Sequence, residues 1–199
     1  MTVGMSDIQM MLNSLVNKVK GIILTPVEAF QQARADDPKT LLMYFAPLLV
    51  FYAILATIVS MVLTVILSIF NPLGIAGGIV ASILGFFIIL IAYPIIAAIF
   101  TVWLHIITYI AGGRKDIFQT GKAVFYGMTP TLLLGWIPIV AYVAGIVSII
   151  YATIGLRELQ ELDTVRAIIV MAIAVLVPLV IVIILAVLFF AAIFAGNLL

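Results

Sequence analysis

The side chain best suited to chemistry in this sequence is His105, the single histidine of the chain. It lies in a long segment that contains no Lys, Arg, Asp or Glu. Thr101, His105 and Thr108 fall at helical spacing, with Gly112 one turn further on, so they would share one face of a helix. An ionisable side chain in such a segment is a candidate for proton transfer or ligand binding. A neutral histidine bonded to a threonine hydroxyl or a carbonyl is also a common packing device, and the sequence leaves both interpretations open.

The other residue types argue against enzymatic chemistry. The chain has no cysteine and one histidine, which excludes a thiolate site and a histidine zinc site. The acids lie where they would cap helices, with Asp37, Asp116 and Asp163 each directly before a predicted helix. Arg157 and Glu161 are four residues apart and would pair along one helical turn. We therefore predict no catalytic site, no metal site and no cofactor.

The composition identifies an integral membrane protein. Of the 199 residues, 66% are hydrophobic and 9% are charged, whereas soluble domains carry about 25% charged residues. No water-soluble fold could bury so much apolar surface. The net charge of +1 gives no reason to expect a nucleic-acid partner.

Three uncharged runs set the positions of the membrane spans. A spanning helix needs about 20 apolar residues. The first run breaks at the turn-forming "NPLGIAGG", the second breaks at "GWIP", and the third gives one long helix. The predicted fold is an all-α bundle of five transmembrane helices, which forms one domain over residues 40–199. The spans cover about residues 40–70, 76–111, 117–134, 139–156 and 164–197.

The charges fix the predicted topology. With five spans, the nine Lys and Arg and the eight acids all fall on the side of the N-terminus. The positive-inside rule then places the N-terminus in the cytoplasm and the C-terminus outside. Arg114, Lys115 and Lys122 would hold the loop between the second and third spans in the cytoplasm.

Residues 1–39 form a predicted cytoplasmic segment before the first span. Apolar residues at helical spacing from Ile8 to Ile23 predict an amphipathic helix. This helix would either lie in the inner membrane interface or pack on the cytoplasmic ends of the spans. In the interface, Lys18 and Lys20 would face anionic headgroups of the inner leaflet.

Small and hydroxyl side chains recur along the first, second and fourth spans. Such residues let helix backbones approach and form hydrogen bonds between helices, so bundle packing is the leading interpretation, ahead of a substrate path. The two short central spans also leave packing faces that a second copy of the chain would fill, and homo-oligomerisation stays open.

Several short motifs follow one another in a recognisable order: "TPVEAF", "HIITYIAGGRKDIFQT", "FYGMTP" and "GLRE". Their residues are Pro26, Phe30, His105, Gly112, Gly113, Phe118, Tyr126, Pro130, Pro138, Gly155, Leu156, Arg157, Arg166 and Ala167. In these residues the chain resembles the YIP domain family (Ypt/Rab-interacting proteins), whose members have five membrane spans. The resemblance extends from about residue 25 to the end, and the order and spacing of the motifs make it specific.

The resemblance implies a non-catalytic role at a membrane. Eukaryotic members look like adaptors of the secretory pathway that bind prenylated small GTPases and act in vesicle traffic or membrane shaping. Only about 40 residues precede the first span here, without the long cytosolic region of those members. The resemblance therefore does not carry GTPase binding over to this chain. The short form resembles the prokaryotic branch, which implies a multi-pass protein of the plasma membrane.

Two functions from different classes follow. We expect an adaptor or organiser that meets a cytoplasmic protein at the loops around Arg114 and Arg157, or acts on membrane shape, with membrane lipids around it. The alternative is a small transporter or lipid-handling protein that uses a polar site around His105. A close-packed site at His105 would count against the alternative, and a wet or lipid-filled cavity there would favour it.

Overall fold

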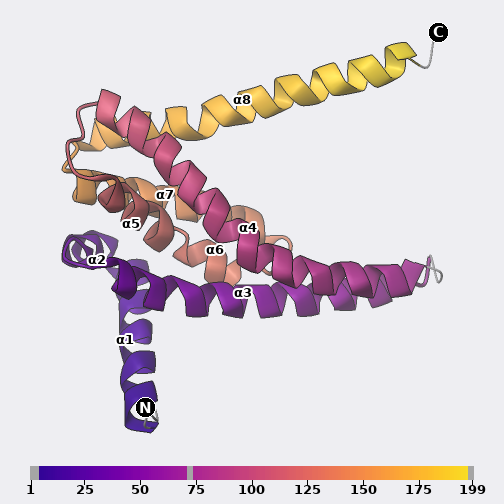
Figure 1. Ribbon diagram of the computed structural model, residues 1–199, viewed down its shortest axis with the longest axis horizontal. Helices are drawn as coiled ribbons and strands as arrows, with labels where there is room; N and C mark the ends of the chain where they lie inside the picture. Colours follow the sequence, from indigo (N-terminus) through magenta and orange to yellow (C-terminus); the bar gives the residue numbers. More distant parts are fainter. Residues whose placement is uncertain (1–4, 71–73, 197–199) are drawn as a thin grey trace.

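The computed structural model describes residues 5–70 and 74–196, and within them it is built of α-helices (Figure 1). The elements are α1 (Met5–Leu24), α2 (Pro26–Ala33), α3 (Pro38–Leu67), α4 (Ile75–Ile110), α5 (Ile117–Gly127), α6 (Thr129–Leu134), α7 (Val140–Gln160) and α8 (Thr164–Gly196). The all-α prediction is thus confirmed. The "NPL" of the first predicted turn and the end of the fifth predicted span, at residue 197, lie outside the described residues.

Four helices are long and apolar enough to cross a membrane. They are α3, α4, α7 and the part of α8 from Thr164 to Ile193. These helices correspond to the first, second, fourth and fifth predicted spans. The chain is therefore a multi-pass membrane protein.

The third predicted span, residues 117–134, is wrong as a single helix. Its limits hold, because α5 begins and α6 ends there, but the helix breaks at Met128. Pro130 has no N–H to bond the carbonyl of Tyr126, and the hydroxyl of Thr129 donates to that carbonyl instead, over 2.6 Å. The segment is therefore divided into two pieces, each too short to cross a bilayer alone.

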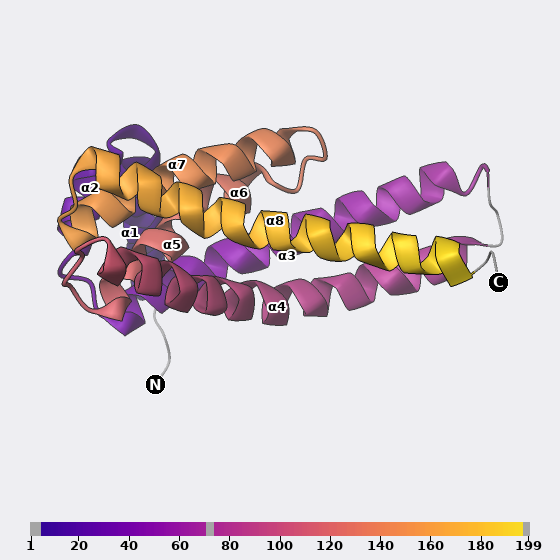
Figure 2. The same cartoon turned by 90° about the horizontal axis from the view of Figure 1, so that it is seen from above.

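The helices form a compact body at one end of the molecule and long projections at the other. In Figures 1 and 2, α2, α5 and α7 gather at one end, and the far halves of α3, α4 and α8 extend past the turn between α6 and α7. α8 diverges from α3 and α4 toward its C-terminal end (Figure 1). The core lies in the body, where Phe30, Tyr44, Tyr126 and Leu156 are buried.

α5 and α7 pack backbone against backbone in this body. A Cβ on Gly127 of α5 would lie 2.7 Å from the main chain of Ala152, and one on Gly155 of α7 would lie 3.0 Å from the Cα of Ala123. Because neither glycine carries that atom, the two helices approach closely. The α5–α7 pair is the support on which the polar residues described below are positioned.

α1 runs across the long axis of the molecule (Figure 1). Its C-terminal half packs on the body, with Ile22 buried and Leu15 and Val19 partly buried. Its N-terminal half exposes Met11 and Leu12. Packing on the helix ends, one of the two predicted alternatives, therefore describes one half of the helix, and the interfacial position of the other half stays a prediction.

The three predicted aspartate caps are confirmed. Asp37, Asp116 and Asp163 each accept a hydrogen bond from the backbone N–H three residues on, at 2.7, 2.9 and 3.0 Å. At Asp37 the hydrogen bonds from Thr40 hold the pKa of the carboxyl below its ordinary value. These caps fix where α3, α5 and α8 begin.

The predicted pair between Arg157 and Glu161 is wrong. Arg157 pairs with its neighbour Glu158 at 2.7 Å, and Glu161 pairs with Lys115 at 2.9 Å. The reason is the end of α7, where Glu161 has a left-handed backbone with φ of 55°. Its side chain therefore leaves the face that a continued helix would give it.

Candidate functional site

Lys122, which with Arg114 and Lys115 is predicted to hold the inner loop in the cytoplasm, has no exposed surface. α5 directs it to the C-terminal end of α2. There its ammonium donates over 2.8, 2.7 and 3.3 Å to the carbonyls of Ala33, Arg34 and Asp36. Three donors thus meet three carbonyls at a helix end, where the last turn lacks intrahelical partners. The negative end of the α2 dipole stabilises the buried cation.

Asp36 connects the same end of α2 to α1 and α5. Its carboxylate accepts a hydrogen bond of 2.6 Å from the hydroxyl of Tyr126 and pairs with the ammonium of Lys18. Lys18 also lies over the Tyr126 ring, 4.8 Å from its centroid. Of the two predicted membrane-surface lysines, Lys18 thus has a partner within the protein, whereas Lys20 keeps the exposure that contact with headgroups needs.

Gln160 holds the loop between α4 and α5 against the end of α7. Its side chain is buried. The amide nitrogen donates to the carbonyl of Asp116 at 3.1 Å and to the hydroxyl of Thr120 at 2.9 Å. The amide oxygen accepts from the backbone N–H of Lys115 at 3.1 Å. One side chain therefore fixes both the loop and the first turn of α5.

His105 lies at the end of this network. Its Nδ1 is 2.9 Å from the hydroxyl oxygen of Thr120, which is fully buried. The geometry is that of a histidine bonded to a threonine, as the packing interpretation predicts. Thr101 and Thr108 turn to their own helix, where each hydroxyl donates to the carbonyl four residues back, at 2.8 and 2.7 Å. The polar residues that were predicted to share a helix face with His105 therefore do not form one polar cluster with it.

The end of α4 explains Gly112, Gly113 and Arg114. Gly112 has φ of 102°, a conformation that favours glycine. A Cβ on Gly113 would lie 2.6 Å from the methyl group of Thr108. Arg114 donates to the carbonyls of Tyr109 and Gly113 at 2.7 and 3.0 Å, and its guanidinium lies 4.6 Å from the centroid of the Tyr109 ring. These contacts close the helix and leave Arg114 at the surface.

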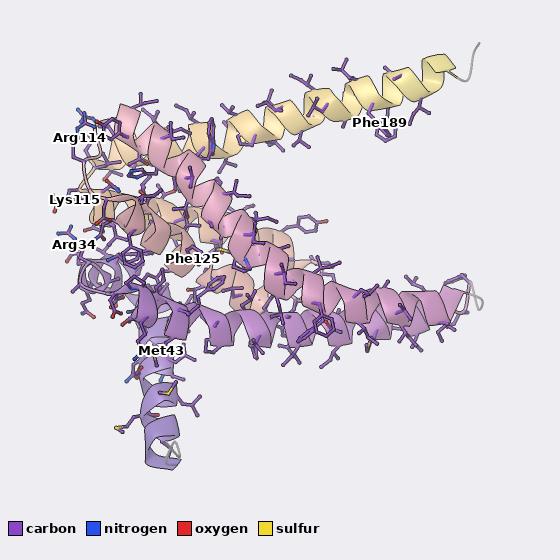
Figure 3. The ribbon with its side chains drawn as sticks, viewed as in Figure 1. Arg34, Met43, Arg114, Lys115, Phe125 and Phe189 are labelled. Carbon is purple, nitrogen blue, oxygen red and sulfur yellow. The ribbon has the colours of Figure 1, made fainter. Side chains whose placement is uncertain are left out.

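A charged surface covers this end of the molecule, and we define it by the exposed residues Arg34, Arg114, Lys115, Glu161 and Arg166. Figure 3 shows the three basic residues that it labels there at one end, far from Phe189. Glu161 lies 3.5 Å from Arg34 and 2.9 Å from Lys115, so it joins segments from three parts of the sequence. The hydrogen bond and charge of Lys115 hold the pKa of Glu161 below its ordinary value.

The remaining predicted residues support their neighbours. The ring centroid of Phe118 is 5.0 Å from the ammonium of Lys122, and Pro130 lies in the first turn of α6, after the break. Arg166 pairs with Asp163 at 3.0 Å. Tyr126 and Arg157 have the partners given above, Asp36 and Glu158.

Sequence reasoning missed Asp36, Thr120 and Gln160, and it missed the burial of Lys122. Lys122 carried a usable signal, because a lysine inside an apolar helical segment needs a partner. Asp36 and Gln160 carried none, since Asp36 bonds a residue 90 positions away and Gln160 one 40 positions away. Only the fold brings such partners together.

Two apolar grooves flank α7. One, of about 380 Å³, lies among α4, α5 and α7 and is lined by residues such as Phe100, Val124 and Ala152. The other, of about 510 Å³, lies between α7 and α8. His105 lines neither groove. The polar site predicted at His105 and the open spaces described here are thus separate.

The chain matches a family model described as Yip1 domain over residues 20–189. The match begins within α1 and ends within α8. It therefore includes the residues that contact one another around Lys122 and around Gln160, with the exception of Lys18. No curated protein and no solved structure matches the chain.

Proposed function

Because the chain belongs to the Yip1 domain family, we propose that it is a non-catalytic membrane protein that recruits or organises a protein partner at the cytoplasmic face. The observation that carries the proposal is the charged surface. Its residues come from separate segments, and buried side chains hold those segments in place: Lys122 holds the end of α2, and Gln160 holds the loop before α5. A binding surface with such support keeps its geometry.

A topology belongs to the proposal. α3, α4, α7 and α8 each cross the membrane, and α5 with α6 makes the remaining crossing as a broken helix. Broken helices are tolerated at membrane depth where the protein itself satisfies the freed backbone groups, as the hydroxyl of Thr129 does for Tyr126. Five crossings put the N-terminus in the cytoplasm and the C-terminus outside. All nine Lys and Arg then stay in the cytoplasm, in agreement with the positive-inside rule.

The charge of the surface indicates the chemistry of the partner. Arg34, Arg114, Lys115 and Arg166 outnumber the exposed acids beside them, which are Glu161, Asp163 and Asp116, so an acidic segment of a cytoplasmic protein is complementary to the surface. Complementary charge mainly sets the association rate and the choice of partner. The exposed apolar N-terminal half of α1, together with exposed Lys20 of its other half, would hold this surface close to the membrane.

Charge reversal with crosslinking in cells tests the proposal. The triple variant Arg114→Glu, Lys115→Glu and Arg166→Glu inverts the surface and leaves Lys122 and Gln160 intact. A photoreactive amino acid in place of Ile117, which is exposed beside the surface, captures what binds there. We expect partner adducts in the wild type to disappear in the triple variant and to persist in Lys39→Glu, which reverses an exposed cation outside the surface. If every adduct and every phenotype survives the triple reversal, the proposal fails.

The alternative, a transporter or lipid-handling protein that uses His105, has less support. His105 is bonded to a fully buried threonine, and neither groove reaches it. Flux measurements in proteoliposomes would reverse this ranking if they gave a transport activity that His105→Ala abolishes.

A further inference from the structure

The groove between α7 and α8 has an apolar length and one polar end. Ile150 of α7 and Ala172 and Leu176 of α8 line its length, and Arg157 and Thr164 line the end that lies toward the charged surface. The buried side chain of Met171 contributes to its lining. This groove of about 510 Å³ is therefore apolar along its length and has a charged residue at one end only.

Arg157 keeps one edge of its guanidinium toward the groove. Its Nε and one terminal nitrogen contact Glu158 Oε1 at 2.8 and 2.7 Å. The other terminal nitrogen lies 3.5 Å from the hydroxyl of Thr164. A guanidinium has five N–H donors and can bind an anion on each of two edges. Glu158 occupies one edge, and a phosphate beside Thr164 would be bound by the other.

The length of the groove matches one leaflet of a bilayer. Thr164 and Leu176 both line it, and their separation of twelve residues on α8 corresponds to about 18 Å. Half of a hydrocarbon core is about 15 Å thick. An acyl chain that lies along the groove would therefore reach from the headgroup level to the middle of the membrane.

We propose that the α7–α8 groove binds a glycerophospholipid, with its phosphate on Arg157 and Thr164 and one acyl chain along the apolar length. The complementary charges of phosphate and guanidinium select this occupant over a neutral lipid. The assignment to the inner leaflet follows from the topology proposed above, whereas the binding itself does not depend on it. The groove among α4, α5 and α7 offers a contrast, because no charged residue is among those that line it.

Native mass spectrometry of the full chain in detergent tests this site. The probes are phosphatidylglycerol and a diacylglycerol with the same acyl chains, which lacks only the phosphate headgroup. We expect a phosphatidylglycerol adduct and at least tenfold weaker binding of diacylglycerol. Arg157→Gln should weaken phosphatidylglycerol binding about tenfold, the size expected for the loss of a charge-assisted hydrogen bond. Ala172→Phe, which fills the groove and changes no polar contact, should weaken it by a similar factor.

Matched variants control for charge and bulk. Lys39→Gln removes an exposed cation from the same end, and Ala186→Phe adds the same ring to α8 away from the groove. Both should bind phosphatidylglycerol as the wild type does. Unchanged elution volume and helical circular dichroism show that a variant is folded. If Arg157→Gln does not fold, the binding measured for Ala172→Phe decides the test. Equal binding of the two lipids, or wild-type binding by either folded groove variant, would overturn the proposal.

Discussion

At the scale of single residues, Lys122 is one of the side chains that connect the N-terminal segment to the membrane domain, together with Tyr126. A buried ammonium without partners is very unfavourable, but here it meets three carbonyls, and the carboxylate of Asp36 lies in the same cluster. The donors belong to α5, and the acceptors belong to the end of α2 and the link to α3. Because Arg34 follows α2, Lys122 holds this part of the charged surface, whereas Gln160 holds the loop with Arg114 and Lys115.

Lys122→Met tests this dependence. The variant keeps the length of the side chain and removes the three donors, so the carbonyls of Ala33, Arg34 and Asp36 lose their partner. We expect the free energy of unfolding to fall by about 3 kcal/mol. Lys39→Met, at an exposed position, should change it by less than about 0.5 kcal/mol. Denaturant unfolding in detergent measures both, and equal stabilities of the two variants would contradict the assigned role.

His105 gives a second residue-scale prediction, which concerns its tautomer. Gln160 donates to the hydroxyl oxygen of Thr120, and we predict that the hydroxyl proton of Thr120 is donated to Nδ1 of His105. Nδ1 should therefore accept this hydrogen bond, and the ring proton should lie on Nε2. It is the single histidine of the chain, so the ¹⁵N shifts of its ring are unambiguous. Thr120→Val should release the preference and give a mixture of tautomers, whereas a proton on Nδ1 in the wild type would contradict this network.

Residue roles could be predicted from the sequence only where the partner is local. The caps at Asp37 and Asp116 were predictable because a capping side chain bonds the backbone three residues on. A bond between His105 and a threonine or a carbonyl was one of the two interpretations that the sequence left open, and the partner is Thr120 of another helix. The Lys122 contacts could not be predicted, because they join α5 to a segment almost 90 residues earlier.

At the scale of elements, the contact between α5 and α7 is set by glycine. A Cβ on Gly127 would lie 2.7 Å from the backbone of Ala152, and backbone cannot move aside as a flexible side chain can. Gly145 of α7 has nothing within 4 Å of its Cβ position. The same substitution should therefore have opposite effects at these two glycines.

Gly127→Ala and Gly145→Ala form a matched pair for this contact. Gly127→Ala should force α5 and α7 apart and lower the free energy of unfolding by about 1–3 kcal/mol. Gly145→Ala should raise it by about 0.5–1 kcal/mol, because alanine is the better helix former. Thermal unfolding of the two purified variants gives the comparison. A stabilised Gly127→Ala would mean that the helices are not in backbone contact there.

The limits of the elements were largely predictable, because uncharged runs and turn residues mark them. Predicted spans 117–134 and 139–156 agree closely with the start of α5, the end of α6 and the start of α7. The break at Met128 was not predicted, although Pro130 is its cause. A proline kinks some helices and divides others, and the outcome here depends on local bonds such as that of Thr129 to the carbonyl of Tyr126.

At the scale of the whole molecule, the long helices exceed what a bilayer needs. α3, α4 and α8 have 30, 36 and 33 residues, or about 45, 54 and 50 Å at 1.5 Å per residue. α7, with 21 residues, is about 32 Å long and matches a core of about 30 Å. The long helices must therefore tilt or project. Their exposed far halves, including Phe189 (Figure 3), would contact lipid or a second copy of the chain, and homo-oligomerisation stays a prediction.

The central claim is that the charged surface faces the cytoplasm while the turn between α6 and α7 lies on the other side of the membrane. The chain has no cysteine, so single cysteines can be introduced as Lys115→Cys in the charged surface and Ile139→Cys in the turn. Both positions are exposed. We predict that a membrane-impermeant maleimide labels Lys115→Cys only in inside-out vesicles and Ile139→Cys only in right-side-out vesicles. Labelling of both cysteines from the same face would contradict the topology and the cytoplasmic docking surface that depends on it.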